Sequence, residues 1–344
     1  MAKRIRLSSD GGTVFYTLPG NSGELRNEAG EIVDTVFGQE FQSTQPGLIG
    51  WSITSNALYK GFAGYVATIK RVGISTAIVG GGMTLVTGKT YRITNAAHTI
   101  WDRNATLTVK DNAVTVAASN IESIDFLYGR VTFAAAYTVT GPVTVDFNYF
   151  PTTALCGANT FTLTQTAEAV DTTDMCLAQG NGGYRVFEYG LKSVGLEMSG
   201  FYNLAAGYLA LLQSRAELII EINPDGSNES VCRGFFRCTS EGLSGAVGNP
   251  EEESVSFALA VPDEELLYKP FRWSHTTTTT LNQAIRIALD AWETSDTIDA
   301  QYLPNGTTGV EGQVIVTEVS LTGGLEAMNE FSVQLQGLGI LSTV

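Results

Sequence analysis

The sequence repeats itself, and a repeat limits the possible folds because each copy must build the same supersecondary unit. Residues 63–69 (AGYVATI) recur as residues 206–212 (AGYLALL), a shift of 206 − 63 = 143 positions. Just upstream, residues 50–54 (GWSIT) are echoed by residues 195–199 (GLEMS). Copied units serve architecture more often than catalysis, so the sequence favours a repeated scaffold.

A second correspondence links the middle of the chain to its C-terminal part. The matched ranges are 224–226 with 304–306 at a shift of 80, 234–237 with 312–315 at 78, and 257–259 with 333–335 at 76. Each copy would contain a Pro-x-Gly turn, a strand that begins with glycine, and a second strand. We expect short loop deletions to absorb the small drift in the shift.

Most of the chain alternates apolar and polar residues with the period of two that predicts half-buried strands. The strands predicted in this way are 160–166, 254–259 and 331–335, with one hairpin formed by 106–110 and 114–116 and another by 129–133 and 143–149. The predicted class is mainly β, built from duplicated β-sandwich or partial-barrel domains.

Three segments change to helical spacing, and each has one apolar face that should pack on a sheet. The apolar positions are Leu58, Phe62, Val66 and Ile69 after Ser55; Leu204, Tyr208, Leu211 and Leu212 after Asn203; and Leu281, Ala284, Ile285, Ala288, Leu289 and Trp292 after Thr280. Gln283 completes a capping box with Thr280. These units suggest three parts: residues 1–155, 156–265 and 266–344.

Composition excludes several function classes. The 344 residues are 44% hydrophobic and 16% charged, with a formal charge of −15. This acidity disfavours a role in gripping nucleic acid phosphates, although an acidic lining around sliding DNA is compatible with it. The sequence has no apolar run of membrane-spanning length and no apolar signal core after Met1, so we expect synthesis in the cytosol without membrane insertion.

No catalytic, cofactor or metal site is predicted. His98 and His275 are the only histidines, and neither has recognisable catalytic or metal partners. Residues 80–90 resemble a phosphate-binding loop, but its two key glycines are one position too far apart, so we interpret them as a glycine hinge followed by a strand. The cysteines lack metal-finger spacing; Cys232 and Cys238 could share one face of a strand.

Two polar stretches, residues 18–47 and 240–253, predict long exposed loops, which are uncommon in compact β proteins unless they contact a partner. The second is rich in glycine and alanine and ends in three glutamates. It is either a solvated loop or an arm that orders on a neighbouring molecule. The candidate contact residues are Ser240, Glu241, Gly242, Leu243, Ser244, Gly245, Glu251, Glu252 and Glu253.

The C-terminal part carries a resemblance to a known family. A capped helix (281–293), a strand that ends at Pro304-Asn305-Gly306, a strand over 312–321 and a strand over 331–339 follow one another. This order resembles the major tail tube protein of long-tailed bacteriophages, and residues 234–260 repeat its strand plan. Residues 125–133 with 141–151 are also similar to segments of such proteins.

The resemblance implies a non-enzymatic structural virion protein whose rings stack into a hollow tube for DNA ejection. It implies a tube domain with a packed helix that completes a β-barrel on oligomerisation. It also implies contacts with a tape-measure protein, transiting double-stranded DNA, and tail terminator and distal tail proteins, after assembly in the cytoplasm of a host bacterium. Residues 240–253 would then be an inter-ring loop. Simple family members form sixfold rings, so two fused domains favour a trimer over a hexamer.

Two alternatives from other classes remain. A β-sandwich virion or cell-surface adhesion module would be expected to carry a signal peptide or an aromatic binding patch. A carbohydrate-active enzyme would need two carboxylates at a fixed separation, and the sequence identifies no such pair.

Overall fold

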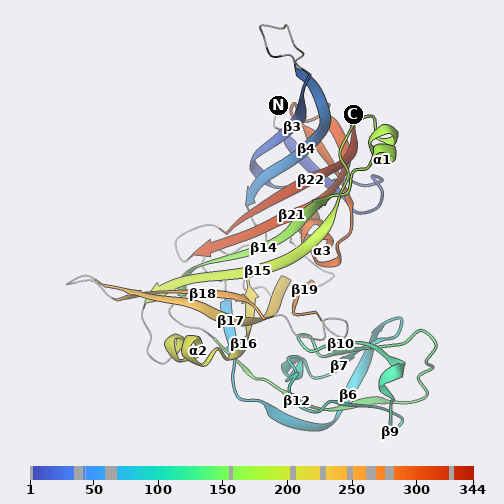
Figure 1. The fold of residues 1–344 in the computed structure, drawn as a ribbon. Helices are drawn as coiled ribbons and strands as arrows, with labels where there is room; N and C mark the ends of the chain where they lie inside the picture. Colours follow the sequence, from blue (N-terminus) through green and yellow to red (C-terminus); the bar gives the residue numbers. More distant parts are fainter. Residues whose placement is uncertain are drawn as a thin grey trace.

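The protein is mainly β, and most of its strands join one large, curved sheet (Figure 1). The computed structural model describes residues 3–34, 42, 44–58, 68–154, 158–201, 207–224, 230–245, 251–260, 269–275, 283–324 and 329–344. The large sheet contains β1 (Arg4–Ser8), β2 (Tyr16–Thr17), β3 (Gly20–Val33), β4 (Thr44–Leu58), β5 (Thr68–Val72), β13 (Thr152–Ala154), β14 (Ala158–Asp171), β15 (Phe187–Phe201), β16 (Glu217–Asn223), β17 (Ser230–Ser244), β18 (Glu252–Leu259), β19 (Phe271–His275), β20 (Ile298–Leu303), β21 (Val310–Gly324) and β22 (Glu330–Thr343).

Eight of these strands form an uninterrupted antiparallel row in the order β3-β4-β22-β21-β14-β15-β18-β17. Their apolar positions alternate with polar ones, as the period of two predicted. In β14, for example, Phe161 and Leu163 are buried while Thr162 and Thr164 are not. One face of the row therefore lies on the core and the other faces solvent.

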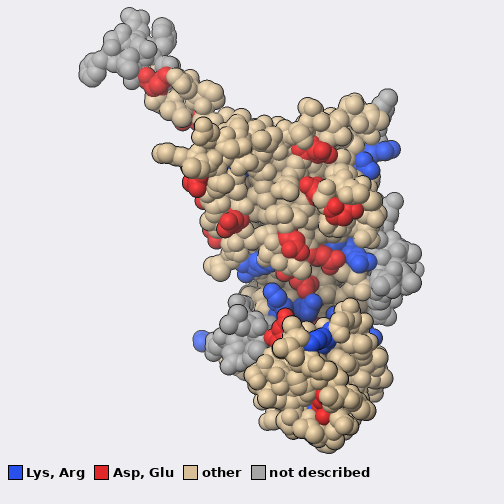
Figure 2. All heavy atoms as spheres, turned by 90° about the vertical axis from the view of Figure 1, so that its right-hand side faces the viewer, with Lys and Arg blue, Asp and Glu red and all other residues tan. Residues whose placement is uncertain are grey.

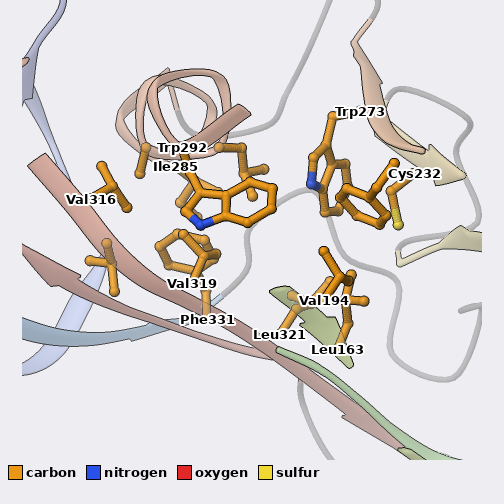
Figure 3. Close-up of a cluster of buried hydrophobic side chains, with 14 of the residues drawn as sticks. Leu163, Val194, Cys232, Trp273, Ile285, Trp292, Val316, Val319, Leu321 and Phe331 are labelled. Atoms are coloured by element: carbon orange, nitrogen blue, oxygen red, sulfur yellow. The ribbon is translucent and has the colours of Figure 1, made fainter. Parts of the chain in front are cut away.

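The main core lies between this row and a second layer that the same sheet forms where it folds over. Ile5 of β1, Ile69 of β5 and Ile220 of β16 belong to the same buried cluster as Leu163 and Val333. Helix α3 (Gln283–Thr294) also packs there (Figure 3). Its stripe matches the prediction for the described part, because Ala284, Ile285, Ala288, Leu289 and Trp292 are all buried. Thr280 and Leu281 lie outside the described residues.

The other two predicted helices need correction. Helix α2 (Tyr208–Ser214) exists, but Gly207 precedes it in a left-handed conformation, and Asn203 and Leu204 lie outside the described residues. In the first segment, Ser55 and Leu58 belong to strand β4, and Ile69 is buried in strand β5. That end of the segment pairs with β16, so the sheet overrides its helical pattern. Residues 59–67 lie outside the described part. A short helix that was not predicted, α1 (Met175–Gly180), joins β14 to β15.

A smaller seven-stranded unit interrupts the chain of the large sheet between β5 and β13, and its core also takes in Ile219 and Phe235 of the large sheet. Its elements are β6 (Thr76–Thr87), β7 (Thr90–Ile93), η1 (Ala96–His98), β8 (Thr108–Asp111), β9 (Val114–Thr115), η2 (Ala118–Asn120), β10 (Ile121–Asp125), β11 (Arg130–Phe133) and β12 (Val143–Tyr149). We call residues 73–151 the insert. Strand β6 pairs with β12 from Thr76 to Gly82 and with β7 from Met83 to Thr87, and the β6–β12 register shifts between Ile78 and Gly81, around Gly80 with its φ of +67°. The predicted glycine hinge thus lies within a strand, beside the point where β6 changes its partner.

One of the two predicted hairpins is confirmed and the other is wrong. Strands β8 and β9 pair as predicted. Strand β11 pairs with β10 and β7, however, whereas β12 pairs with β6 and β8. Their apolar residues, such as Phe133 and Phe147, meet in one core rather than along one ladder. The connection instead crosses to Asp111, whose carboxylate accepts hydrogen bonds from the N–H groups of Thr140 and Gly141, both at 2.8 Å.

The large sheet consists of two repeats with the same strand registers. Repeat A comprises β1 to β4, α3 and β20 to β22; repeat B comprises β5, β13 to β18 and α2. The β3–β4 ladder shifts register at Gly20/Ser22 and Ala29/Glu31, and the β14–β15 ladder shifts at Ala158/Thr160 and Ala167/Ala169. Both irregularities lie 138 positions apart (158 − 20 and 167 − 29). The repeat therefore extends to its β-bulges, which are conserved structural features rather than defects.

The β17–β18 hairpin of repeat B and the β21–β22 hairpin of repeat A also shift register at equivalent positions. The β17–β18 ladder shifts between Cys238 and Ser240, and the β21–β22 ladder shifts between Val316 and Glu318, 316 − 238 = 78 positions later. Cys238 pairs with Phe257, and Val316 pairs with Leu335, so the second strands also match at 78. The predicted shift of 76 for that strand is wrong. The predicted shift of 80 at the preceding turn agrees with the registers in which β16 pairs with β17 and β20 pairs with β21.

Repeat B lies inside repeat A along the chain. In repeat A, residues 9–15 connect β1 to β2. The equivalent connection in repeat B runs from β5 to β13 and is the insert. Strands from residues 1–155, 156–265 and 266–344 all pair in the large sheet, so these ranges do not delimit separate sheets. As domain boundaries they stay a prediction.

Candidate assembly surface

The solvent-facing side of the eight-strand row is a continuous polar surface, which we call the polar face. Directly paired residues of antiparallel strands share a face, so the registers define its members. They are Ser22, Glu24, Arg26, Glu28, Ser52, Thr54, Asn56, Thr160, Thr162, Thr164, Thr166, Ser193, Gly195, Glu197, Ser199, Arg237, Ser240, Gly242, Ser244, Glu252, Ser254, Ser256, Ala258, Glu318, Ser320, Thr322, Glu330, Ser332, Gln334 and Gln336. The exposed Leu191 and Phe201 extend the β15 row at its two ends.

Hydroxyl groups hold this surface together across the strands. The hydroxyls of Thr160 and Ser199 lie 2.6 Å apart, and those of Thr166 and Ser193 lie 2.7 Å apart. Short side chains that bond to each other leave few groups projecting from the sheet. The polar face is therefore low in relief and offers little apolar area to a bound molecule.

The charge on the polar face is mostly negative. Six glutamates lie on it, against Arg26 and Arg237: Glu24, Glu28, Glu197, Glu252, Glu318 and Glu330. Figure 2, a view of another side, shows carboxylates spread over the upper body and basic side chains gathered where the body meets the insert. The period of two predicted strands with one polar side, and the strand register assigns the individual acids to this face.

Both ends of the row have an edge without a strand partner among the described residues. Strand β3 pairs only with β4. Strand β17 pairs with β16 as far as Arg237 and with β19 as far as Gly234, but beyond Arg237 it pairs only with β18. Unpaired edges expose backbone N–H and C=O groups and are templates for pairing with another chain.

The candidate contact segment 240–253 is mostly hairpin rather than loop. Ser240, Glu241, Gly242, Leu243 and Ser244 lie in β17, and Glu252 and Glu253 lie in β18. Gly245 and Glu251 flank residues 246–250, which lie outside the described part. Glu252 is on the polar face while Glu253 is buried, so these neighbouring carboxylates point to opposite faces of the sheet. The other predicted loop, 18–47, is likewise largely the β3–β4 hairpin.

A network of charges joins the insert to β16, β17 and β19. The Arg272 guanidinium contacts Asp125 Oδ2 at 3.0 Å and Glu293 Oε1 at 2.9 Å. Burial alone would lower the pKa of Arg272, but the two carboxylates outweigh it and raise that pKa. The Tyr128 hydroxyl donates to the Val231 carbonyl at 2.6 Å. These contacts leave the polar face uncovered.

A cavity and the two histidines are features of the described residues that bear on catalysis or ligand binding, and the His275 ring lies 2.6 Å from the Ser230 hydroxyl and 3.3 Å from an Asp290 carboxylate oxygen. A cavity of about 530 Å³ lies between α2 and the insert, lined by Arg71, Asp102, Leu211, Glu217 and Phe235 among others. Arg103, at its wall, forms an ion pair with Glu217. No cluster of three metal-type ligands occurs in the described part, where His98 packs on Tyr149 and His275 stacks on Trp273.

The three described cysteines are free thiols. Cys232 and Cys238 both lie in the main core, on one face of β17 as predicted, whereas Cys176 is exposed; Cys156 lies outside the described residues. None of the described helices is long and apolar enough to span a membrane.

Comparisons with solved structures give partial likenesses, among them two gene transfer agent particles. No protein-family model matches the chain, and no curated protein matches it either. The tail of an empty gene transfer agent particle, solved with C6 symmetry, aligns with 37% of this chain and 87% of its own at 16% identity and a TM-score of 0.30. The virion of a native gene transfer agent particle aligns with 37% and 89%, again at 16% identity and 0.30.

Proposed function

We propose that the protein is a structural subunit of a phage-type tail tube. In this proposal its chains form rings, and stacked rings form a hollow conduit for double-stranded DNA. The observation that carries the proposal is the eight-strand row, which is polar on one face and has no strand partner at either edge among the described residues. A ring of such rows closes into a continuous barrel and removes the two exposed edges of each row.

The repeat gives the number of subunits in the proposed ring. Each chain supplies two copies of a four-strand unit, β3-β4-β22-β21 and β14-β15-β18-β17. Since the two copies have equivalent registers, three chains present six nearly equivalent units around an axis. We therefore propose a trimeric ring with pseudo-sixfold geometry rather than a hexamer.

The polar face would line the conduit. Its glutamates repel the phosphates of DNA, and its short hydroxyl side chains provide no protruding contacts on which DNA would stall. This arrangement needs no cofactor and no enzymatic activity. A tape-measure protein inside the tube, and terminator and distal proteins at its ends, would be the further partners, in a virion assembled in the bacterial cytoplasm.

Negative-stain electron microscopy of the purified protein tests the proposal. Tubes or stacked rings with threefold symmetry are expected at high protein concentration. Monodisperse monomers under all assembly conditions would refute the tail-tube function. They would leave the alternative of a virion or cell-surface binding module, for which the insert is the candidate part.

A further inference from the structure

We infer that β3 of one copy pairs antiparallel with residues 240–244 of β17 of a second copy, with Leu25 opposite Leu243. This inference deepens the proposed function, because it names the joint that closes the ring and fixes its register. An equivalent joint already exists inside the chain, between β21 and β14.

The internal joint lies where repeat A meets repeat B. Strand β21, the last of the four-strand unit of repeat A, pairs with β14, the first of the four-strand unit of repeat B. Thr162 faces Thr322, Leu163 faces Leu321, and Thr166 faces Glu318. Leu163 and Leu321 are 0% and 1% exposed, so the joint is sealed on its core side by two leucines.

The strands equivalent to those of the internal joint lie at the two unpaired edges, so the same pairing can be expected there between two copies. Strand β14 corresponds to β3 at a shift of 138, and β21 corresponds to β17 at a shift of 78. Leu163 and Leu321 therefore become Leu25 and Leu243. The same shifts place Glu24 opposite Ser244, Arg26 opposite Gly242, Asn27 opposite Glu241, and Glu28 opposite Ser240.

The transferred pairs are chemically compatible. Leu243 is 57% exposed in the single chain, and Leu25 is only partly buried, so both gain burial in the joint. No like charges face each other, and the Asn27 amide can donate to the Glu241 carboxylate. A one-residue slip would instead move Leu243 to the polar side of the partner strand.

Disulfide cross-linking tests the register. Opposed residues of antiparallel strands have Cα atoms about 4.5–5.5 Å apart, within the range that a disulfide spans. In a background with Cys156→Ser and Cys176→Ser, the pair Leu25→Cys and Leu243→Cys should cross-link under mild oxidation into covalent species of up to three chains. The matched control, Leu25→Cys with Glu241→Cys, keeps the same face of β17 but is two positions out of register, and should cross-link at least tenfold less.

The results distinguish failure of the proposed β3–β17 pairing from failure of the proposed tail-tube function. When chains carrying only one cysteine each are mixed, the cross-link should stop at dimers, which shows that it joins different chains. Covalent trimers without tubes would support the joint and refute the tail-tube function. Tubes without the Leu25–Leu243 cross-link, or with equal cross-linking of the control, would refute the joint and leave the function. Absence of both tubes and cross-links refutes both.

A substitution gives an independent measurement. Leu243→Asp places a carboxylate on the core side of the joint and should raise the protein concentration needed for ring formation at least tenfold. Leu191→Asp, at a residue that is 85% exposed and away from both edges, should leave that concentration unchanged. Circular dichroism confirms that both variants are folded. An equal effect of the two changes, or no effect of Leu243→Asp, would overturn the inference.

Discussion

The two repeats fill one equivalent core position with different pairs of side chains. Placing the pair of repeat B into repeat A, and measuring the free energy of unfolding, tests whether the positions are equivalent. In repeat A, Trp51 packs over Gly337 and Gly312, is 2% exposed, and donates its indole N–H to the Gly339 carbonyl at 2.9 Å. One residue beyond the Gln336–Ser52 pair, the β4–β22 register continues to Trp51 and Gly337. One residue beyond the Gly195–Ala258 pair, the β15–β18 register continues to Val194 and Leu259, the equivalent position of repeat B.

The single changes should both be costly. A methyl group on Gly337 would overlap the Trp51 indole, and the ring cannot move without straining its hydrogen bond. Overpacking costs about 1–3 kcal/mol and a lost hydrogen bond about 0.5–1.5 kcal/mol, so we expect Gly337→Ala to destabilise by about 2–4 kcal/mol. Trp51→Val leaves a cavity and should cost about 2–4 kcal/mol.

The double variant Trp51→Val with Gly337→Leu installs the side chains of repeat B. We expect it to lose less than about 2 kcal/mol, which implies a coupling of several kcal/mol between the positions. Urea denaturation of the unassembled protein, followed by circular dichroism, measures the difference. Gly195→Ala is the matched control, because its new methyl group would meet only the Phe257 carbonyl at 3.9 Å and should be nearly neutral. A double variant as unstable as the combined single changes would refute the equivalence.

Four further predictions follow from other parts of the molecule. Asp111 is buried, which opposes ionisation, but hydrogen bonds from Thr140, Gly141 and Tyr137 lower its pKa below 3.8. The ionised carboxylate therefore stabilises the fold above about pH 4, and this stabilisation is lost as the pH falls. In urea denaturation, Asp111→Asn should lower the free energy of unfolding by about 1.5–3 kcal/mol at neutral pH and by less near pH 3. Replacing residues 73–151 by the equivalent loop 9–15 should preserve ring assembly in electron microscopy, whereas loss of all folded protein would contradict the assignment of the insert to a loop position. Glu197→Lys with Glu318→Lys should slow DNA passage and make assembled tubes retain DNA at low salt but release it at high salt; unchanged retention in a filter assay would count against an electrostatic lining. Deleting residues 246–250 should leave rings intact and shorten tubes if the β17–β18 tip is an inter-ring contact, and unchanged tube length would exclude that role.

Sequence periodicity predicted the β class and the α3 stripe because both depend on local alternation of apolar residues. It failed where pairing decided the outcome. The segment that ends at Ile69 has helical spacing, but β16 needs a partner there, and β5 supplies it. Strands β11 and β12 are adjacent in sequence, yet they belong to different ladders because their apolar side chains face each other across a core.

The candidate surface shows the same division. The run from Thr160 to Thr166 indicates a strand with one hydroxyl face, which is visible in the sequence alone. The two free edges and the glutamates between them follow from strand order and register, which depend on contacts between distant parts of the chain. Bulges shift those registers by single residues, and no local pattern reveals them.

The nesting of repeat B inside repeat A has a consequence for synthesis on the ribosome. Repeat B can pair all of its strands once the chain has reached Leu259, but β4 and β14 keep open edges until β22 and β21 are made. A chain that ends before β21 therefore has two unpaired strand edges, at β4 and β14, and lacks the single continuous row. Synthesis of β21 and β22 is thus required for the continuous row on which the proposed polymerisation depends, so the fold itself distinguishes chains with these strands from chains without them.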